Sequence, residues 1–299
     1  MIQNEKRGTE GLTTPFKTVK TGTLGLLTAF TPEIFRSEYL TRIISGIIDA
    51  LRPTPYELKL IMVRDGETVE PTERIFRRSS VDGFLLLTWR IHPRYVEEIQ
   101  NGYNSLPMVV INDYALDLNA NIVYTDAREG AQLAMRHLLN RGYRRLGMLQ
   151  APTDDSLDAQ EREKVFRETL EKEGIELDPE HFRQCEYFFE EDGYIKTMEM
   201  IQMAKRLPRA LVCFNDDLAI GAIRAFREEK ILVPQEVAVV GFDGIERGKY
   251  INPPLTTVRQ PLEQMGRQMV QTLIGLIRGE LTPPVQVRFD QQLVIRQSA

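Results

Sequence analysis

This chain of 299 residues has few of the residues that build metal centres and disulfide frameworks. It contains two cysteines and three histidines, and neither type stands at the spacing of a zinc site. It also lacks an apolar run long enough to cross a membrane, and its first residues hold no apolar segment of a secretory signal. We therefore expect a soluble, cytoplasmic protein with no metal, no cofactor and no membrane association.

The charged residues are not concentrated in any one part of the chain. The formal net charge is −5, and lysine and arginine are spread along the sequence rather than clustered. Nucleic-acid-binding domains usually carry a basic patch, and the sequence shows none. Residues 1–20 are polar and aperiodic, and Pro15 disfavours a helix through them. We interpret residues 1–20 as a tail and expect no direct DNA binding by the chain as given.

Motifs of enzyme active sites are also missing. The sequence contains no G-x-S-x-G elbow, no Walker loop and no glycine-rich dinucleotide loop after its first strand-like run. Its adjacent carboxylate pairs, Asp154-Asp155 and Asp216-Asp217, are neighbours in sequence, so their side chains tend to diverge. We interpret both pairs as turn and helix-cap residues rather than as a general acid and base, and we predict that the protein is not an enzyme.

What the sequence does contain is a regular alternation of strand-like and helix-like segments. Short apolar runs typical of buried parallel strands occupy 23–27, 58–63, 81–87 and 107–111. Helical spacing of apolar residues occurs at 38–51, 93–100 and 128–140, the last followed by Gly142 as a left-handed cap. The alternation then restarts, with strands expected at 146–149, 210–214 and 237–242 and helices at 158–173, 193–206, 216–229 and 262–278.

These two blocks of β-α repetition predict an α/β protein with two doubly wound parallel-sheet lobes. The restart places a boundary between the lobes near residue 142. Two further strand-like pieces, at 285–289 and 292–295, end the chain.

One stretch, residues 233–261 (VPQEVAVVGFDGIERGKYINPPLTTVRQP), carries the most specific pattern. A buried strand there ends at Asp243, and in α/β proteins ligands bind at the carboxyl ends of strands. Further short motifs occur in order at 20–25 (KTGTLG), 82–83 (DG), 137–142 (HLLNRG), 215–221 (NDDLAIG) and 293–298 (LVIRQS). Together they resemble the effector-binding core of the LacI/GalR family of bacterial transcriptional regulators, whose fold is shared with periplasmic sugar-binding proteins.

The resemblance implies two lobes joined by a three-strand crossover hinge, with a small-molecule site in the cleft between them. It divides the chain into a tail at 1–20, an N-terminal lobe at 21–141 plus 262–286, and a C-terminal lobe at 142–261 plus 287–299. Full-length members begin with a helix-turn-helix, for which residues 1–20 have no matching pattern. The implied function is ligand sensing by a homodimer, controlling DNA binding through a module absent from this chain.

The resemblance assigns three polar residues to the ligand, and each has a simpler structural alternative. Asp243 would accept hydrogen bonds from ligand hydroxyls, or it could be a turn or N-cap aspartate. Asn215 would donate to and accept from a hydroxyl, or it could cap the helix that follows. Arg162 would bind two adjacent hydroxyls or a carboxylate, or it could be a solvated surface residue. The sequence departs from the family pattern at Gly244, where a second acid is common, and at Val165, where glycine is usual.

Aromatic side chains are the remaining candidates, because they can cover the apolar face of a ring. Phe188 lies where the family places a stacking aromatic, Trp89 follows a predicted strand, and Tyr39 begins the first predicted helix. Phe188 could instead be an ordinary core residue, and Tyr39 is the weaker candidate, from the opposite lobe. Weaker candidates near the lobe boundary, which could merely cap helices, are Asp126, Glu129 and Asn112.

The expected effector is a sugar or related polyol, with a purine or a phosphorylated sugar as the alternatives. Two other classes of protein share parts of this pattern. A solute-binding protein for sugar uptake would need a signal peptide or lipid anchor, and a nucleotide-dependent dehydrogenase would need a phosphate-binding glycine loop. The sequence shows neither, so we favour the sensing core of a transcriptional regulator.

Overall fold

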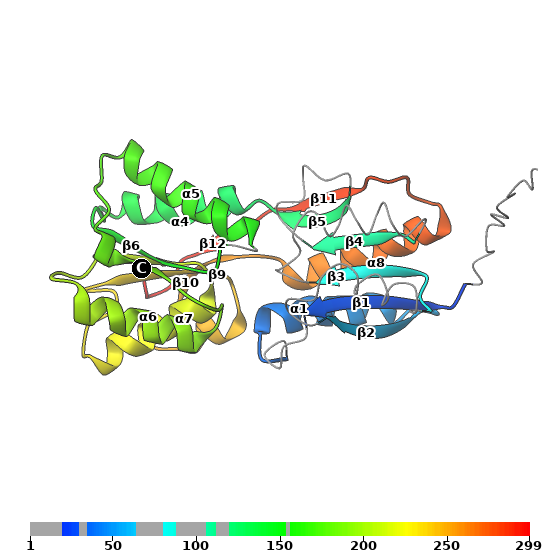
Figure 1. Ribbon diagram of the computed structural model, residues 1–299, viewed down its shortest axis with the longest axis horizontal. Coiled ribbons are helices and arrows are strands. Elements are labelled where there is room, and N and C mark those ends of the chain that lie inside the picture. Colours follow the sequence, from blue (N-terminus) through cyan, green and yellow to red (C-terminus); the bar gives the residue numbers. More distant parts are fainter. Residues whose placement is uncertain (1–19, 30–34, 64–79, 88–105, 112–119, 154–155) are drawn as a thin grey trace, which may run out of the picture.

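The computed structural model describes residues 20–29, 35–63, 80–87, 106–111, 120–153 and 156–299. Two six-stranded sheets form the centres of two lobes that lie end to end (Figure 1). Within the described residues, the strand pairings are parallel except for that of β10 (Thr256–Arg259) with β12 (Gln292–Val294). The prediction of an α/β protein with two largely parallel sheets is therefore confirmed. No helix in these ranges is long and apolar enough to cross a membrane.

The first lobe is built around a sheet with the strand order β11-β5-β4-β3-β1-β2. These strands are β1 (Thr23–Ala29), β2 (Glu57–Val63), β3 (Gly83–Leu87), β4 (Met108–Ile111), β5 (Asn121–Thr125) and β11 (Gln286–Phe289). Helices α1 (Glu38–Leu51) and α8 (Leu262–Arg278) pack together against one face of this sheet. The burial of their apolar sides against the strands forms one hydrophobic core.

The second lobe repeats the arrangement around a sheet with the order β12-β10-β9-β8-β6-β7. Its remaining strands are β6 (Leu146–Gln150), β7 (Phe182–Gln184), β8 (Ala210–Cys213) and β9 (Ala238–Asp243). Helices α6 (Glu190–Met203) and α7 (Asp216–Glu228) form one helix pair, and α4 (Ala127–Asn140) and α5 (Leu157–Lys172) form the other (Figure 1). Short 3-10 helices lie at η3 (Pro179–His181) and η4 (Glu246–Lys249).

The chain passes between the lobes three times: between β5 and α4, between β10 and α8, and between β11 and β12. The packing moves two of the expected boundaries. Helix α4 packs on α5 and contributes Met135 and Leu138 to the core of the second lobe, so the first crossing lies at Asp126 instead of residue 141. Strand β11 pairs with β5 in the first sheet, so that segment of the first lobe reaches residue 289 instead of 286. Periodicity could not place either element, because it does not say which sheet an apolar face covers.

Three short strands, β5, β7 and β10, do not appear among the expected elements. Each has five residues or fewer, and polar residues such as Thr256 and Thr257 interrupt the apolar pattern in β10. Helix α6 begins at Glu190, three residues before the expected start. Gly142 follows α4 with φ +84°, which confirms the predicted left-handed cap. The predicted helix at 93–100 lies outside the described residues.

Helices α1 and α8 cross at two glycines, which lets their backbones approach closely. A Cβ atom on Gly46 would lie 2.1 Å from the carbonyl oxygen of Glu263, and one on Gly266 would lie 2.1 Å from that of Ile43. Both distances are far inside van der Waals contact, and the atoms they meet are backbone. The crossing of the two helices therefore has no room for a side chain at either position.

We predict that Gly46→Ala destabilises the protein, although alanine normally favours a helix over glycine. Overpacking against the Glu263 backbone should lower the free energy of unfolding by about 1–3 kcal/mol. Chemical denaturation monitored by circular dichroism would measure the change. Ser45→Ala, at an exposed neighbouring position on α1, is the control and should leave stability unchanged or slightly raised. A Gly46→Ala variant as stable as Ser45→Ala would contradict the close helix crossing.

Candidate functional site

A cleft lies between the lobes at the carboxyl end of the second sheet. It encloses about 540 Å³ of empty space that is continuous with solvent. The first lobe contributes Ser37 and Tyr39, from the start of α1, and the second lobe contributes the rest of the lining. Those second-lobe residues are Ser156, Asp158, Arg162, Phe188, Phe189, Phe214, Asn215, Asp217 and Asp243. Five of the six residues predicted from the sequence therefore line one cleft.

Asp243 lies at the end of β9 with only 7% of its surface exposed. Its Oδ1 atom accepts a hydrogen bond of 2.8 Å from Nε2 of Gln260, at the second crossing between the lobes. Burial raises the pKa of Asp243 to about 7, although the nearby Arg162 guanidinium and the Gln260 hydrogen bond oppose the shift. The backbone of Asp243 has φ +108°, which is rare for a residue with a side chain and marks local strain. Asp243 is thus neither a helix cap nor a solvated turn residue.

The structure explains why glycine follows Asp243. Gly244 has φ +74°, and a Cβ atom there would lie 2.5 Å from Cγ and 2.8 Å from Cα of Arg259 on the neighbouring strand. A second acidic residue at this position, as the family pattern suggested, would collide with Arg259 in this conformation.

Arg162 is buried on α5, with 5% of its surface exposed, which excludes a solvated surface role. Its guanidinium stacks on the ring of Phe242 at 3.5 Å and on that of Phe214 at 4.4 Å. One Nη atom donates to the carbonyl of Phe214 at 2.7 Å, and the other lies 3.4 Å from Oδ2 of Asp158. Among the described residues, Nε of Arg162 has no hydrogen-bond partner. The cation is therefore held rigidly beside Asp243 and Asp158.

Asn215 combines the two roles considered for it. Its Oδ1 atom accepts from the backbone N–H of Leu218 at 2.8 Å and so caps α7. Its Nδ2 atom donates to the carbonyl of Phe188 at 2.9 Å, while the side chain also lines the cleft. Phe188 packs edge-to-face on Phe214, with ring centroids 5.6 Å apart. Asn215 thereby fixes the loop that presents Phe188 to the cleft.

The two acids after Asn215 do more than the predicted turn or cap role, because Asn215 itself caps the helix. Asp216 is fully buried and accepts from Oγ1 of Thr257 at 2.6 Å and from the backbone N–H of Ile245 at 2.8 Å. It thus ties the segment after β9 to α7, and burial raises its pKa well above the usual range. Asp217 lines the cleft and pairs with Arg247 at 2.6 Å. Burial raises the pKa of Asp217 to about 6, although Arg247 opposes the shift.

The remaining predicted residues fall elsewhere. Trp89 and Asn112 lie outside the described residues, as does the acid pair Asp154-Asp155. Asp126 caps α4, accepting from the backbone N–H of Glu129 at 3.0 Å. The Glu129 carboxylate forms an ion pair with Arg288 on β11. Neither Asp126 nor Glu129 lines the cleft. The parts of the chain that the structure describes hold no cluster of metal-ligating side chains.

A chain of side-chain hydrogen bonds links Asp243 to the three crossings. Nε2 of Gln291 donates to Oγ1 of Thr125 at 3.0 Å, and Thr125 in turn donates to Oε1 of Gln260 at 2.7 Å. Gln260 then donates to Asp243 through Nε2. Thr125, Gln260 and Gln291 each lie at a different crossing, and all are buried. The carboxylate in the cleft is thus bonded directly into the hinge.

Comparisons with known proteins agree with this geometry. A family model described as a periplasmic binding protein-like domain matches residues 135–299. The ribose operon repressor of Haemophilus influenzae is 28% identical over 264 residues, which cover 88% of this chain and 76% of the repressor. The transcriptional repressor CytR of Escherichia coli is 29% identical over 218 residues, which cover 73% of this chain but only 62% of CytR.

A solved structure supports the same assignment over nearly the whole chain. The transcriptional regulator CelR, in a complex with cellobiose, has a TM-score of 0.83 and 27% sequence identity, and the match covers 94% of this chain and 85% of CelR. The family model itself spans more than half of the 299 residues. The relatives and the solved structure named above are transcriptional repressors and a transcriptional regulator. This protein therefore belongs to the periplasmic binding protein-like domain family.

Proposed function

We propose that this chain is the effector-sensing core of a LacI-type transcriptional regulator and that it binds a small polyhydroxylated molecule, most simply a sugar, in the cleft between its lobes. The observation that supports this proposal best is the convergence of Asp243, Arg162 and Asn215 on one cleft that both lobes line. Membership in a group that includes a repressor named for the ribose operon supports the same class of ligand.

The chemistry of the cleft suits a neutral ligand that is rich in hydroxyl groups. Asp158, Asp217 and Asp243 supply acceptors, whereas the two Nη atoms of Arg162 already donate to Phe214 and Asp158, and only its Nε lacks a partner among the described residues. An excess of acceptors selects a ligand that donates, and each sugar hydroxyl carries one donor. The rings of Phe188, Phe189 and Phe214 offer apolar faces or edges for the carbon skeleton. The ligand roles of Asp243, Asn215, Arg162, Phe188 and Tyr39 are part of this proposal.

The effector would act by changing the relative position of the two lobes. Ser37 and Tyr39 approach the cleft from one lobe and Asp243 from the other, so a ligand that contacts both favours the closed arrangement. In a cytoplasmic homodimer, closure would alter the spacing of two DNA-reading modules and thereby operator affinity. The coupling free energy equals the ligand's differential affinity for the two arrangements, typically about 1–3 kcal/mol.

We predict that the folded protein is stabilised by one of the probes D-ribose, cellobiose and hypoxanthine, because a ligand that binds only the folded state raises the melting temperature. A shift with ribose or cellobiose would support the polyol proposal, and a shift with hypoxanthine alone would replace it with a purine. Thermal-shift assays followed by calorimetric titration would measure the binding. If no probe of either class binds at millimolar concentration, the proposed ligand class is wrong.

We predict that Asp243→Asn lowers affinity for the bound probe about 10- to 100-fold, the expected loss of a hydrogen bond to a charged group. Asparagine can still accept from Gln260 through Oδ1, so the hinge contact is retained while an acceptor in the cleft becomes a donor. Glu229→Gln, at an exposed position after α7, is the matched control and should bind normally. Equal affinities for the two variants would remove Asp243 from the site.

The raised pKa of Asp243 also predicts opposite effects of pH on stability and on binding. In the folded protein the Asp243 carboxyl stays protonated up to about pH 7, whereas in the unfolded chain it has the ordinary pKa of 3.8. Because the folded state binds more protons between these values, stability of the ligand-free protein should fall as pH rises through this range, by about 2–4 kcal/mol. Ligand affinity should instead rise, because the ionised carboxylate accepts from hydroxyls. Denaturation and titration at pH 5.5 and 8 would test both trends, and Asp243→Asn should weaken both.

A further inference from the structure

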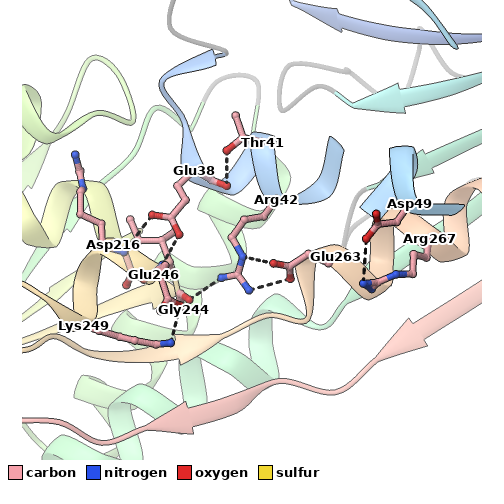
Figure 2. Close-up of polar contacts among 12 residues, drawn as sticks. Glu38, Thr41, Arg42, Asp49, Asp216, Gly244, Glu246, Lys249, Glu263 and Arg267 are labelled. Atoms are coloured by element: carbon pink, nitrogen blue, oxygen red, sulfur yellow. Dashed lines mark hydrogen bonds and ion pairs between the residues drawn. The ribbon is translucent and has the colours of Figure 1, made fainter. Parts of the chain in front are cut away.

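Direct contacts join α1 of the first lobe to the segment that follows Asp243 in the second lobe (Figure 2). This segment, residues 244–247, leaves β9 at the edge of the cleft and enters the 3-10 helix η4. Two side chains of α1 reach it, Glu38 and Arg42, which are one helical turn apart and so lie on the same face of α1. Neither lines the cleft.

Arg42 connects three segments of the chain. Its Nε and Nη2 atoms donate to the two carboxylate oxygens of Glu263, in the first turn of α8, at 2.7 and 2.8 Å. Its Nη1 atom donates across the lobes to the carbonyl oxygen of Gly244 at 2.9 Å. The bidentate pair with Glu263 fixes the plane of the guanidinium, so the third donor is directed at the other lobe. The side chain is only 22% exposed.

Glu38 makes the second contact between the lobes. Its carboxylate accepts from the backbone N–H groups of Glu246 and Arg247, the latter at 3.1 Å. These two N–H groups lie in the first turn of η4, where they have no partner within that helix. The Glu38 carboxylate therefore satisfies backbone donors of the opposite lobe.

The same segment is bonded to the acids of the cleft from its other side. Asp216 accepts from the backbone N–H of Ile245, and Asp217 accepts from the guanidinium of Arg247. Asp243, which lines the cleft, immediately precedes Gly244. A ligand that contacts Asp243 or Asp217 would thus act on residues whose backbone is held by α1.

We infer that Glu38 and Arg42 form an interlobe latch, in which both contacts with residues 244–247 open and close together and hold the lobes closed over the cleft. They are positioning residues and do not touch the ligand. Their regulatory role rests on the proposed sensing function, but the latch itself is present without effector. Loss of either contact should increase the population of the open arrangement, because each contributes to the same equilibrium.

The test is whether breaking one contact releases the other. Arg42→Met removes the guanidinium, which does not bond to the Glu246 and Arg247 amides that Glu38 holds. If the substitution acted only locally, those two amides would stay protected from hydrogen exchange. The latch predicts that Arg42→Met accelerates hydrogen exchange at the Glu246 and Arg247 amides about 10-fold in the ligand-free protein. Small-angle X-ray scattering should show a larger radius of gyration for the same variant. Glu38→Ala should increase the radius in the same way.

Asp49→Asn is the matched control. Asp49 also lies on α1 and pairs with Arg267 of α8 (Figure 2). It also pairs with Arg52, and both partners are in the first lobe. This variant should change neither amide exchange nor the radius. Glu263→Gln, which weakens the orientation of Arg42, should give a smaller change of the same sign and serves if Arg42→Met folds poorly.

Unchanged exchange at Glu246 and Arg247 in both Arg42→Met and Glu263→Gln would overturn the latch, because the two contacts would then be independent. The same conclusion follows if Glu38→Ala exposes those amides without any change in radius. Neither measurement uses an effector, so this inference can fail while the ligand screen succeeds, and the reverse is equally possible.

Discussion

A single buried carboxylate, that of Asp243, constrains much of the surrounding structure. A polar group that is removed from water needs partners, and here Gln260 donates to the Asp243 carboxyl while the Arg162 guanidinium lies nearby. Arg162 must itself be buried, and it is held by two aromatic rings and the Phe214 carbonyl. The strained backbone of Asp243 in turn brings the chain so close to Arg259 that Gly244 must follow.

The position of Asp243 also relates the cleft to the hinge. Gln260 belongs to the second crossing between the lobes, and Thr125 and Gln291 extend its hydrogen bonds to the first and third crossings. All of these side chains are buried, so each bond forms in a medium of low polarity, where an unpaired polar group would be costly. The three backbone crossings are therefore only one part of the hinge. The other part is a polar network that ends on a group in the cleft.

The two lobes differ in what they contribute to the cleft. The second lobe supplies most of the cleft lining, from the ends of β8 and β9 and from α5, whereas the described part of the first lobe supplies Ser37 and Tyr39. Yet α1, which begins with these residues, also carries Glu38 and Arg42, the side chains that reach the second lobe. Helix α1 packs closely on α8 at Gly46 and Gly266. Because the two helices are packed so tightly, a displacement of α1 at the cleft would move α8 with it.

The fold class, the family and five residues of the cleft lining can be predicted from the sequence. Apolar runs that end in Asp243 and in the stretch before Asn215 identify strand ends, because a parallel strand buried on both faces must be apolar throughout and its polar residues appear only where it ends. Tertiary structure alone decided which lobe α4 joins, how Arg162 is buried, and that Asp217 faces the cleft. It alone also decided that Glu38 and Arg42 reach the other lobe. These features depend on contacts between residues far apart in the chain, such as the 202 positions that separate Arg42 from Gly244, and no local pattern of polarity records such a contact.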